Sequence, residues 1–267
     1  DQRLSPSLTA IVRYAMALET QQASTRVGVR NLCSHLRALG RFGTTAFLVP
    51  LFGSGELSQS FCRSAAVFGA TYLLRCSATS IVTDENKVQA VELSGAANKR
   101  ISCSHVVVPD RALCPPATTQ VIRRISILCG KPIGENQQQR HVIVIPPDTF
   151  VDQASTIHGI VLDEGVYVAP HGGCSLLHLT TTTDQAEVGE RILQEALDSV
   201  LASSENDVDE IFHVCFSYPL MDKDARKDIS GLHVIDRPRP GLTADAAFEA
   251  AAALFAGILP DAGFLEV

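Results

Sequence analysis

The segment from Pro50 to Cys76 constrains the fold most, because a turn, a helix and a strand follow one another within it. Gly53 and Gly55 mark the turn, and Gly69 stands where a helix commonly ends in a left-handed cap. Between them, residues that suit a buried helical stripe recur at the required spacing: Leu57, Phe61, Ser64, Ala65 and Phe68. The spacing predicts a helix over 56–68 with one buried face, followed by a strand over 71–74.

Polar side chains of the same helix gather on a second stripe, formed by Glu56, Gln59, Ser60 and Arg63. At about 100° per residue, this stripe lies roughly 130–140° from the apolar one. On periodicity alone, such a stripe is the solvated face of an amphipathic helix. An acceptor, an amide and a guanidinium on one face can also form a recognition surface, and periodicity does not separate the two interpretations.

The composition is that of a globular chain, since 46% of the 267 residues are hydrophobic and 19% are charged. This length fits one large domain, or a domain and a half. A net charge of −7 without a long basic run argues against nucleic acid as the main partner. The apolar run 246–258 is interrupted by Glu249 and is shorter than the about 20 residues that span a bilayer.

The eight cysteines include no C-x-x-C pair, and most lie within apolar patterns. We expect buried, reduced thiols, which favours a cytosolic protein over a disulfide-rich secreted one. The chain begins at Asp1 without a charged and apolar leader, so we expect it to be the later part of a longer protein.

The first part of the chain is predicted to be helical, and strands dominate after the change in character near Phe47. Helices are expected after Ser5, after Thr25 up to a cap at Gly40, from an N-cap at Asp184 to about Ala202, and over 244–259. Asp84-Glu85-Asn86 is predicted to turn a hairpin. The remaining strands are expected over 78–83, 88–93, 104–108, 119–128, 141–145, 157–162, 166–169, 174–182, 211–218 and 232–235.

The motifs that carry catalytic chemistry are missing from the sequence. The turn Gly53-Ser54-Gly55 lacks the Lys-Ser/Thr of a phosphate loop, and no G-x-G-x-x-G occurs. The histidines do not pair at helical metal-ligand spacing, and no cysteine or serine lies in a nucleophile signature. We therefore expect no catalytic residues, no cofactor and no metal site.

The stretch from Gly40 to Arg75 resembles the Rab escort protein and Rab GDP-dissociation inhibitor family. The family pattern G-E-L-P-Q-x-F-x-R reads here Gly55-Glu56-Leu57-Ser58-Gln59-Ser60-Phe61-Cys62-Arg63, and A-x-x-G-G-x-Y reads Ala66-Val67-Phe68-Gly69-Ala70-Thr71-Tyr72. The segments Gly40-Arg41-Phe42-Gly43 and Phe61-Cys62-Arg63 look more like the escort branch. The resemblance is specific over 40–76, loose over 110–240, and departs from the family where Ser58 replaces a proline and Ala70 the second glycine.

The resemblance implies an α/β (α+β) fold: a flavoprotein-like, multi-sheet domain over 46–267 that lacks its N-terminal βαβ unit and carries no flavin. Residues 1–45 would be helices of a smaller helical domain, which in escort proteins also docks type II geranylgeranyl transferase. Glu56, Gln59, Arg63, Thr71 and Leu73 match platform positions that grip the switch regions of a GDP-bound Rab GTPase.

The function implied by the resemblance is that of a non-catalytic escort protein. It would present Rab proteins to the transferase heterodimer, hold the prenyl groups of the Rab tail and deliver the product to membranes from the cytosol. One alternative is a dissociation inhibitor that recycles prenylated Rabs. An alternative of another class is a fragment of an FAD-dependent oxidoreductase, which shares the scaffold and the strand pattern over 71–108.

Overall fold

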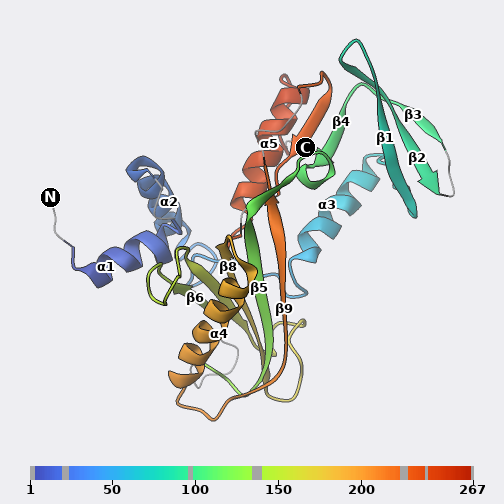
Figure 1. Cartoon of the computed structure of the whole chain (residues 1–267). Helices are drawn as coiled ribbons and strands as arrows, with labels where there is room; N and C mark the ends of the chain where they lie inside the picture. The colour runs from blue at the N-terminus through green and yellow to red at the C-terminus, as the bar shows by residue number, and fades with distance from the viewer. Residues whose placement is uncertain are drawn as a thin grey trace. The chain divides into compact units, whose positions relative to one another are not determined.

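The computed structural model describes residues 4–19, 24–95, 99–133, 140–222, 228–237 and 240–265. It confirms the expected mixture of helices and open sheets (Figure 1). The chain divides into two compact units, which are described separately. The first unit comprises residues 1–59, 118–219 and 240–243, and the second comprises residues 60–117, 220–239 and 244–267.

A five-stranded sheet forms the centre of the first unit, in the order β6-β7-β8-β5-β9. Its strands are β5 (Pro116–Cys129), β6 (His141–Ile145), β7 (Ile157–Leu162), β8 (Cys174–Thr183) and β9 (Asp209–Met221). Neighbouring strands are antiparallel in the pairs β6–β7, β7–β8 and β8–β5. The last four of these five strands were predicted at or within a few residues of these bounds, and β5 begins three residues earlier than expected.

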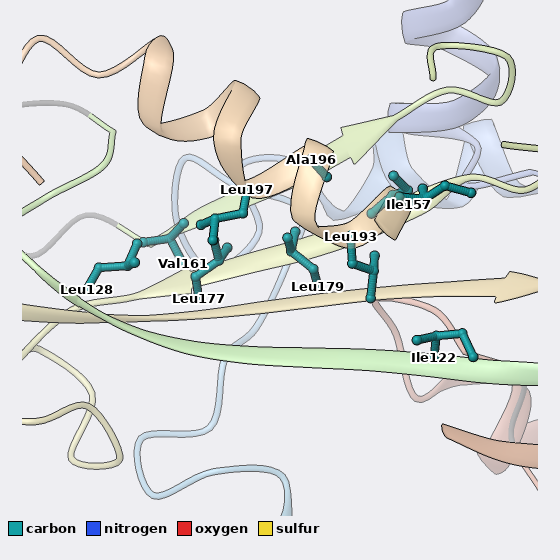
Figure 2. Packing of buried hydrophobic residues seen from close by; sticks show 10 residues of the cluster. Ile122, Leu128, Ile157, Val161, Leu177, Leu179, Leu193, Ala196 and Leu197 are labelled. Atoms are coloured by element: carbon teal, nitrogen blue, oxygen red, sulfur yellow. The ribbon is translucent and has the colours of Figure 1, made fainter. Parts of the chain in front are cut away.

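Helix α4 (Ala186–Ala202) covers one face of this sheet and completes the main hydrophobic core (Figure 2). Alternate residues of the strands point toward the helix, because successive side chains of a strand point to opposite faces. The helix contributes a stripe at helical spacing. The fully or nearly fully buried residues of this core are Ile122, Leu128, Ile157, Val161, Leu177, Leu179, Ile192, Leu193, Ala196 and Leu197.

A glycine of α4 allows the helix to lie directly on β5. A Cβ atom at Gly189 would stand 2.4 Å from Cγ1 of Ile122 and 2.8 Å from Cγ2 of Thr183. Real Cβ atoms essentially never show contacts that short, so a larger residue would force Ile122, Thr183 or the helix to shift.

The other face of the sheet carries polar and titratable side chains. His158 of β7 and His178 of β8 are half-buried there, with Arg123 of β5 on the same face. Burial lowers the pKa of His158 below its ordinary value of 6.5. Burial, and secondly the positive charge of Arg123, lower the pKa of His178 in the same direction. Both histidines are therefore held neutral more strongly in the folded chain than in the unfolded one.

Helices open the first unit, as the sequence predicted. The first is α1 (Pro6–Ala10), which continues as a π-helical turn η1 (Ile11–Met16), and the second is α2 (Thr25–Ala38). Ser5 and Ser24 cap the two helices by accepting hydrogen bonds from Leu8 N–H and Val27 N–H. The inner side of α2 packs on the buried Glu19, whose carboxylate accepts a hydrogen bond from the Asn31 amide.

The second unit contains two small sheets. Strands β1 (Cys76–Asp84), β2 (Lys87–Gly95) and β3 (Arg100–Ser102) pair antiparallel. Glu85 and Asn86 have positive φ at the β1–β2 turn, as the predicted hairpin requires. Strand β4 (Val106–Pro109) pairs parallel with β10 (Leu232–Ile235).

A buried carboxylate ties the ends of β4 and β10 together. Asp110 begins the short 3-10 helix η2 (Asp110–Ala112) and is only 4% exposed. Its two oxygens accept hydrogen bonds from the backbone N–H groups of Arg111 and Arg237. The rest of the unit is formed by most of α3 (Gly55–Val67) and by α5 (Asp245–Ile258), whose Phe248 meets Phe61 of α3 edge to face at 5.8 Å.

Several sequence predictions were wrong, each for a local reason. Residues 71–74 form no strand, because Tyr72 folds back and donates its hydroxyl proton to the Cys62 carbonyl oxygen. Residues 166–169 form turns, in which Val166 and Ala169 N–H groups bond to carbonyls three residues earlier. Asp184 does not cap α4, because its carboxylate accepts a hydrogen bond from Thr119 and Gln185 takes the N-cap position.

The cysteines are free thiols, but the expected burial holds only for Cys114. Cys33 and Cys62 lie on exposed sides of α2 and α3, and Cys129 ends β5 at the surface. In the part of the chain that the structure describes, no helix is long and apolar enough to cross a membrane.

Candidate binding surface around helix α3

The turn that opens α3 is built by hydrogen bonds of its own backbone. Glu56 N–H and Leu57 N–H donate to the carbonyl oxygens of Gly53 and Ser54. Gly53 has a φ of +89°, a conformation that favours glycine. The Glu56 carboxylate reaches back and accepts a hydrogen bond from Phe52 N–H at 2.9 Å. These amides are used within the turn, which agrees with a backbone turn rather than a phosphate cradle.

The same turn is held against the loop that follows β7. The rings of Phe52 and Tyr167 stack at 4.6 Å with an angle of 8° between their planes. Tyr167 N–H donates to the Leu51 carbonyl at 2.8 Å, and Val168 approaches Gly53. Both rings remain more than half exposed, so the stack positions the turn and also presents aromatic surface.

The polar stripe predicted on α3 exists as a helix face. Glu56, Gln59 and Arg63 lie at positions i, i+3 and i+7, so their side chains fall within about 60° around the helix axis. Gln59 and Arg63 are exposed, whereas Glu56 is half-buried and bonded to the turn. The division between the two compact units falls within this helix, after Gln59.

The apolar stripe of α3 is not buried, which contradicts the sequence prediction. Leu57 is 41% exposed, Phe61 44% and Phe68 74%, although Phe61 contacts Phe248. No element in the described part of the chain covers these side chains fully. Both faces of the helix are therefore open to contact with other groups.

The C-terminal cap of α3 determines where the chain leads to the two remaining candidate residues, Thr71 and Leu73. Gly69, at a φ of +93°, donates its N–H to the Ala66 carbonyl, and Ala70 N–H donates to Ala65, which is the Schellman pattern. Ala70 itself keeps a negative φ, so an alanine replaces the family glycine without backbone strain. Thr71 and Leu73 follow in an exposed segment that the Tyr72–Cys62 hydrogen bond holds to the helix.

Sequence reasoning found the helix residues of this surface but missed Tyr167, which it assigned to a strand. The only signal was an aromatic residue two positions after the Gly165 turn, and that pattern alone does not show what the ring meets. Within the described residues, no group of three or more His, Cys, Asp or Glu side chains could hold a metal ion. The arrangement offers hydrogen bonds, charge and apolar area, which are the means of protein recognition.

Comparison with known proteins places this geometry in a family. The family model for GDP dissociation inhibitors matches residues 7–228. The chain is 30% identical over 212 residues to human Rab proteins geranylgeranyltransferase component A 1, covering 75% of this chain and 30% of the relative. It is 28% identical over 286 residues to the Rattus norvegicus protein of that name, covering 98% of this chain and 43% of the relative. It is 26% identical to Rab escort protein 1 of Arabidopsis thaliana over 240 residues, covering 75% and 41%.

Solved structures show the same fold at low sequence identity. The Rab GDI of Plasmodium falciparum superposes with a TM-score of 0.78 at 17% identity, over 98% of this chain and 59% of that one. The flavin-dependent brominase Bmp2 gives 0.53 at 9% identity, over 80% and 57%. These two likenesses confirm the expected flavoprotein-like fold. The chain spans less than half the length of the curated relatives named above. Because the family model matches well over half of its residues, the chain belongs to the GDP dissociation inhibitor family.

Proposed function

We propose that this chain belongs to a Rab escort protein that binds GDP-bound Rab GTPases and presents them to type II geranylgeranyl transferase for prenylation. The observation that carries the proposal is the family match together with an exposed polar stripe at the positions of the family motif. The relatives named as components of Rab geranylgeranyltransferase favour the escort role. The protein would act from the cytosol without catalytic residues of its own and would deliver the prenylated Rab to membranes.

Each candidate residue has a distinct part in this proposal. Arg63 and Gln59 face solvent and would donate hydrogen bonds to a switch loop of the GTPase. Glu56 accepts the Phe52 N–H and would offer its second oxygen while fixing the turn. Leu73, 48% exposed, would add apolar contact beside Thr71. A loop conformation that exists only with GDP would make binding selective for the nucleotide state.

The domain division of the proposal follows the family resemblance. Residues 1–45 would belong to the helical domain and residues 46–267 to the sheet-rich domain that carries part of the platform. The helical part would contribute to docking of the transferase.

The experiment that tests the proposal compares Rab·GDP with Rab·GTP in a titration of the complete protein. We expect clear binding to Rab·GDP and at least tenfold weaker binding to Rab·GTP. Equal affinity for the two states would contradict state-selective recognition, and the absence of binding to either would contradict the proposed function.

A dissociation inhibitor that recycles Rabs is the second candidate, and the match to the GDP dissociation inhibitor family model favours it. The two roles differ in whether the protein also binds the transferase, so a pull-down with the transferase heterodimer separates them. The likeness to a flavin-dependent brominase concerns the fold alone. Absorbance in the flavin bands of the purified complete protein would support the oxidoreductase alternative, and a colourless protein would rule it out.

A further inference from the structure

The segment 24–55 is free of acidic residues, although the whole chain carries a net charge of −7. It contains four arginines, Arg26, Arg30, Arg37 and Arg41. The first three lie on α2 at i, i+4 and i+11, so they fall within about 40° around the helix axis. A strongly basic stripe thus stands on a chain that is acidic as a whole.

This stripe points away from the packed side of α2. Asn31 and Gly28 meet Glu19 on the inner side, roughly 100–200° around the helix from the arginines. All four arginines are exposed, and within the described residues Arg26, Arg30 and Arg37 make no ion pair. Their charges are available to a ligand rather than spent on the fold.

The loop after α2 completes a hollow beside the stripe. Phe47 packs against His35 of α2 with the ring centroids 5.6 Å apart, which holds the loop to the helix. The hollow has a volume of about 690 Å³, and Arg30, Arg37, Arg41, Ser34 and Thr45 contribute to its lining. Guanidinium and hydroxyl groups around an open hollow suit phosphate oxygens, because arginine donates to them in pairs.

Two apolar side chains stand beside the arginines. Phe42 is 74% exposed and Leu48 76%, and both also line the hollow. The guanidinium of Arg41 lies 5.2 Å from the centre of the Phe42 ring. Arginines flanked by exposed phenylalanine and leucine are typical of surfaces that lie in the headgroup region of a bilayer.

We propose that the arginine surface, defined as Arg26, Arg30, Arg37, Arg41, Phe42 and Leu48, binds the anionic face of a phospholipid bilayer. The arginines contact headgroup phosphates, and the two apolar side chains enter the boundary of the acyl layer. This inference stands on α2 and its loop and does not depend on the Rab-binding role of α3. It gives the molecule a second interaction surface with its own ligand chemistry.

The test is co-sedimentation of the complete protein with vesicles of phosphatidylcholine alone or with about 30% phosphatidylserine, a typical anionic composition. We expect binding only to the vesicles that contain phosphatidylserine, and weaker binding as salt is raised. The triple variant Arg30→Ala, Arg37→Ala and Arg41→Ala should bind about a hundredfold more weakly, since each arginine near an anionic surface is worth about fivefold. Alanine preserves helix α2.

A charge-matched control removes three exposed cations elsewhere: Lys87→Ala, Lys99→Ala and Arg100→Ala. This control should bind vesicles within about threefold of wild type, because it removes the same charge but leaves the arginine surface intact. A further variant, Phe42→Ser, should bind these vesicles several-fold more weakly than wild type, and the size of this loss should be the same at low and high salt. Equal loss in the two triple variants would overturn the proposal, as would equal binding to both vesicle types or no vesicle binding at all. Preference for poly-glutamate over vesicles would assign the surface to an acidic protein and would also overturn it.

Discussion

The five-stranded sheet and helix α3 differ in how far their apolar side chains are buried. In the sheet, Leu177, Leu179 and Ile157 are completely buried beneath α4. On α3, Leu57 and Phe61 remain more than 40% exposed, although their spacing is equally regular. The sheet is therefore held by burial, whereas α3 is held by its capping turn, its Schellman end and a few ring contacts. Regular apolar spacing specifies the structure of an element without specifying whether its partner lies in the same chain.

Two leucine-to-alanine substitutions, one in the sheet unit's core and one on α3, should differ most in their effect on stability. Leu193→Ala in α4 removes a fully buried side chain and should lower the free energy of unfolding by about 3 kcal/mol. Leu57→Ala in α3 should cost less than about 1 kcal/mol, because that side chain keeps much of its contact with water. Urea denaturation of both variants measures the difference, and equal losses would mean that α3 is buried after all.

Two helical glycines, one closely packed and one with open space around it, should respond differently to alanine. Gly189→Ala places a methyl group against Ile122 and should lower the free energy of unfolding by about 1–3 kcal/mol. Gly257→Ala in α5 meets nothing within 4 Å and should be neutral or stabilise the helix by up to about 1 kcal/mol. Thermal unfolding checks both, and a stabilising Gly189→Ala would show that α4 does not press on β5.

The two half-buried histidines on the face of the sheet away from α4 give a graded pH dependence. Because folding lowers the pKa values of His158 and His178, the unfolded chain binds more protons at these sites than the folded chain. Their contribution to stability is complete above pH 6.5 and is lost as the pH falls below it. The double variant His158→Gln and His178→Gln should show a shallower loss of unfolding free energy between pH 7 and 5. A slope as steep as that of wild type would assign the dependence to other groups.

The smallest effect concerns the segment after α3. Tyr72→Phe removes the exposed hydrogen bond from the Tyr72 hydroxyl to the Cys62 carbonyl. We expect looser order in residues 70–73, seen as faster amide exchange, and Rab binding weakened about two- to fivefold. Tyr167→Phe is the matched control for amide exchange, because it keeps the ring stack with Phe52 and should leave exchange of residues 70–73 unchanged.

Much of the fold could be predicted because its signals are local. The strands β6, β7 and β10 have the predicted bounds, and α2 begins at Thr25, next to its predicted start. The failures arise where a tertiary contact overrides the local pattern, as when Thr119 engages Asp184 or when the Tyr72 hydroxyl reaches Cys62. Strand-like composition at 166–169 was equally misleading, since turn hydrogen bonds there satisfy the backbone.

The candidate site could be predicted only in part, for a similar reason. Helical spacing placed Glu56, Gln59 and Arg63 on one face, and the structure shows that face. Spacing did not reveal that the Glu56 carboxylate also holds the turn, or that Tyr167 stacks on Phe52. Both contacts join groups whose geometry depends on the folded turn. That these residues contact a Rab GTPase stays a prediction.

Within the polar stripe of α3, Glu56 holds the turn, whereas we propose that the exposed Gln59 and Arg63 face a partner and do not stabilise the helix. The most direct measurement titrates Rab·GDP against the complete protein carrying Arg63→Ala, with urea denaturation of the same variant in parallel. We expect a loss of about 1–3 kcal/mol in binding, roughly five- to 150-fold in affinity, with the free energy of unfolding changed by less than about 0.5 kcal/mol. Unchanged affinity, or a loss of stability as large as the loss of binding, would contradict this proposal.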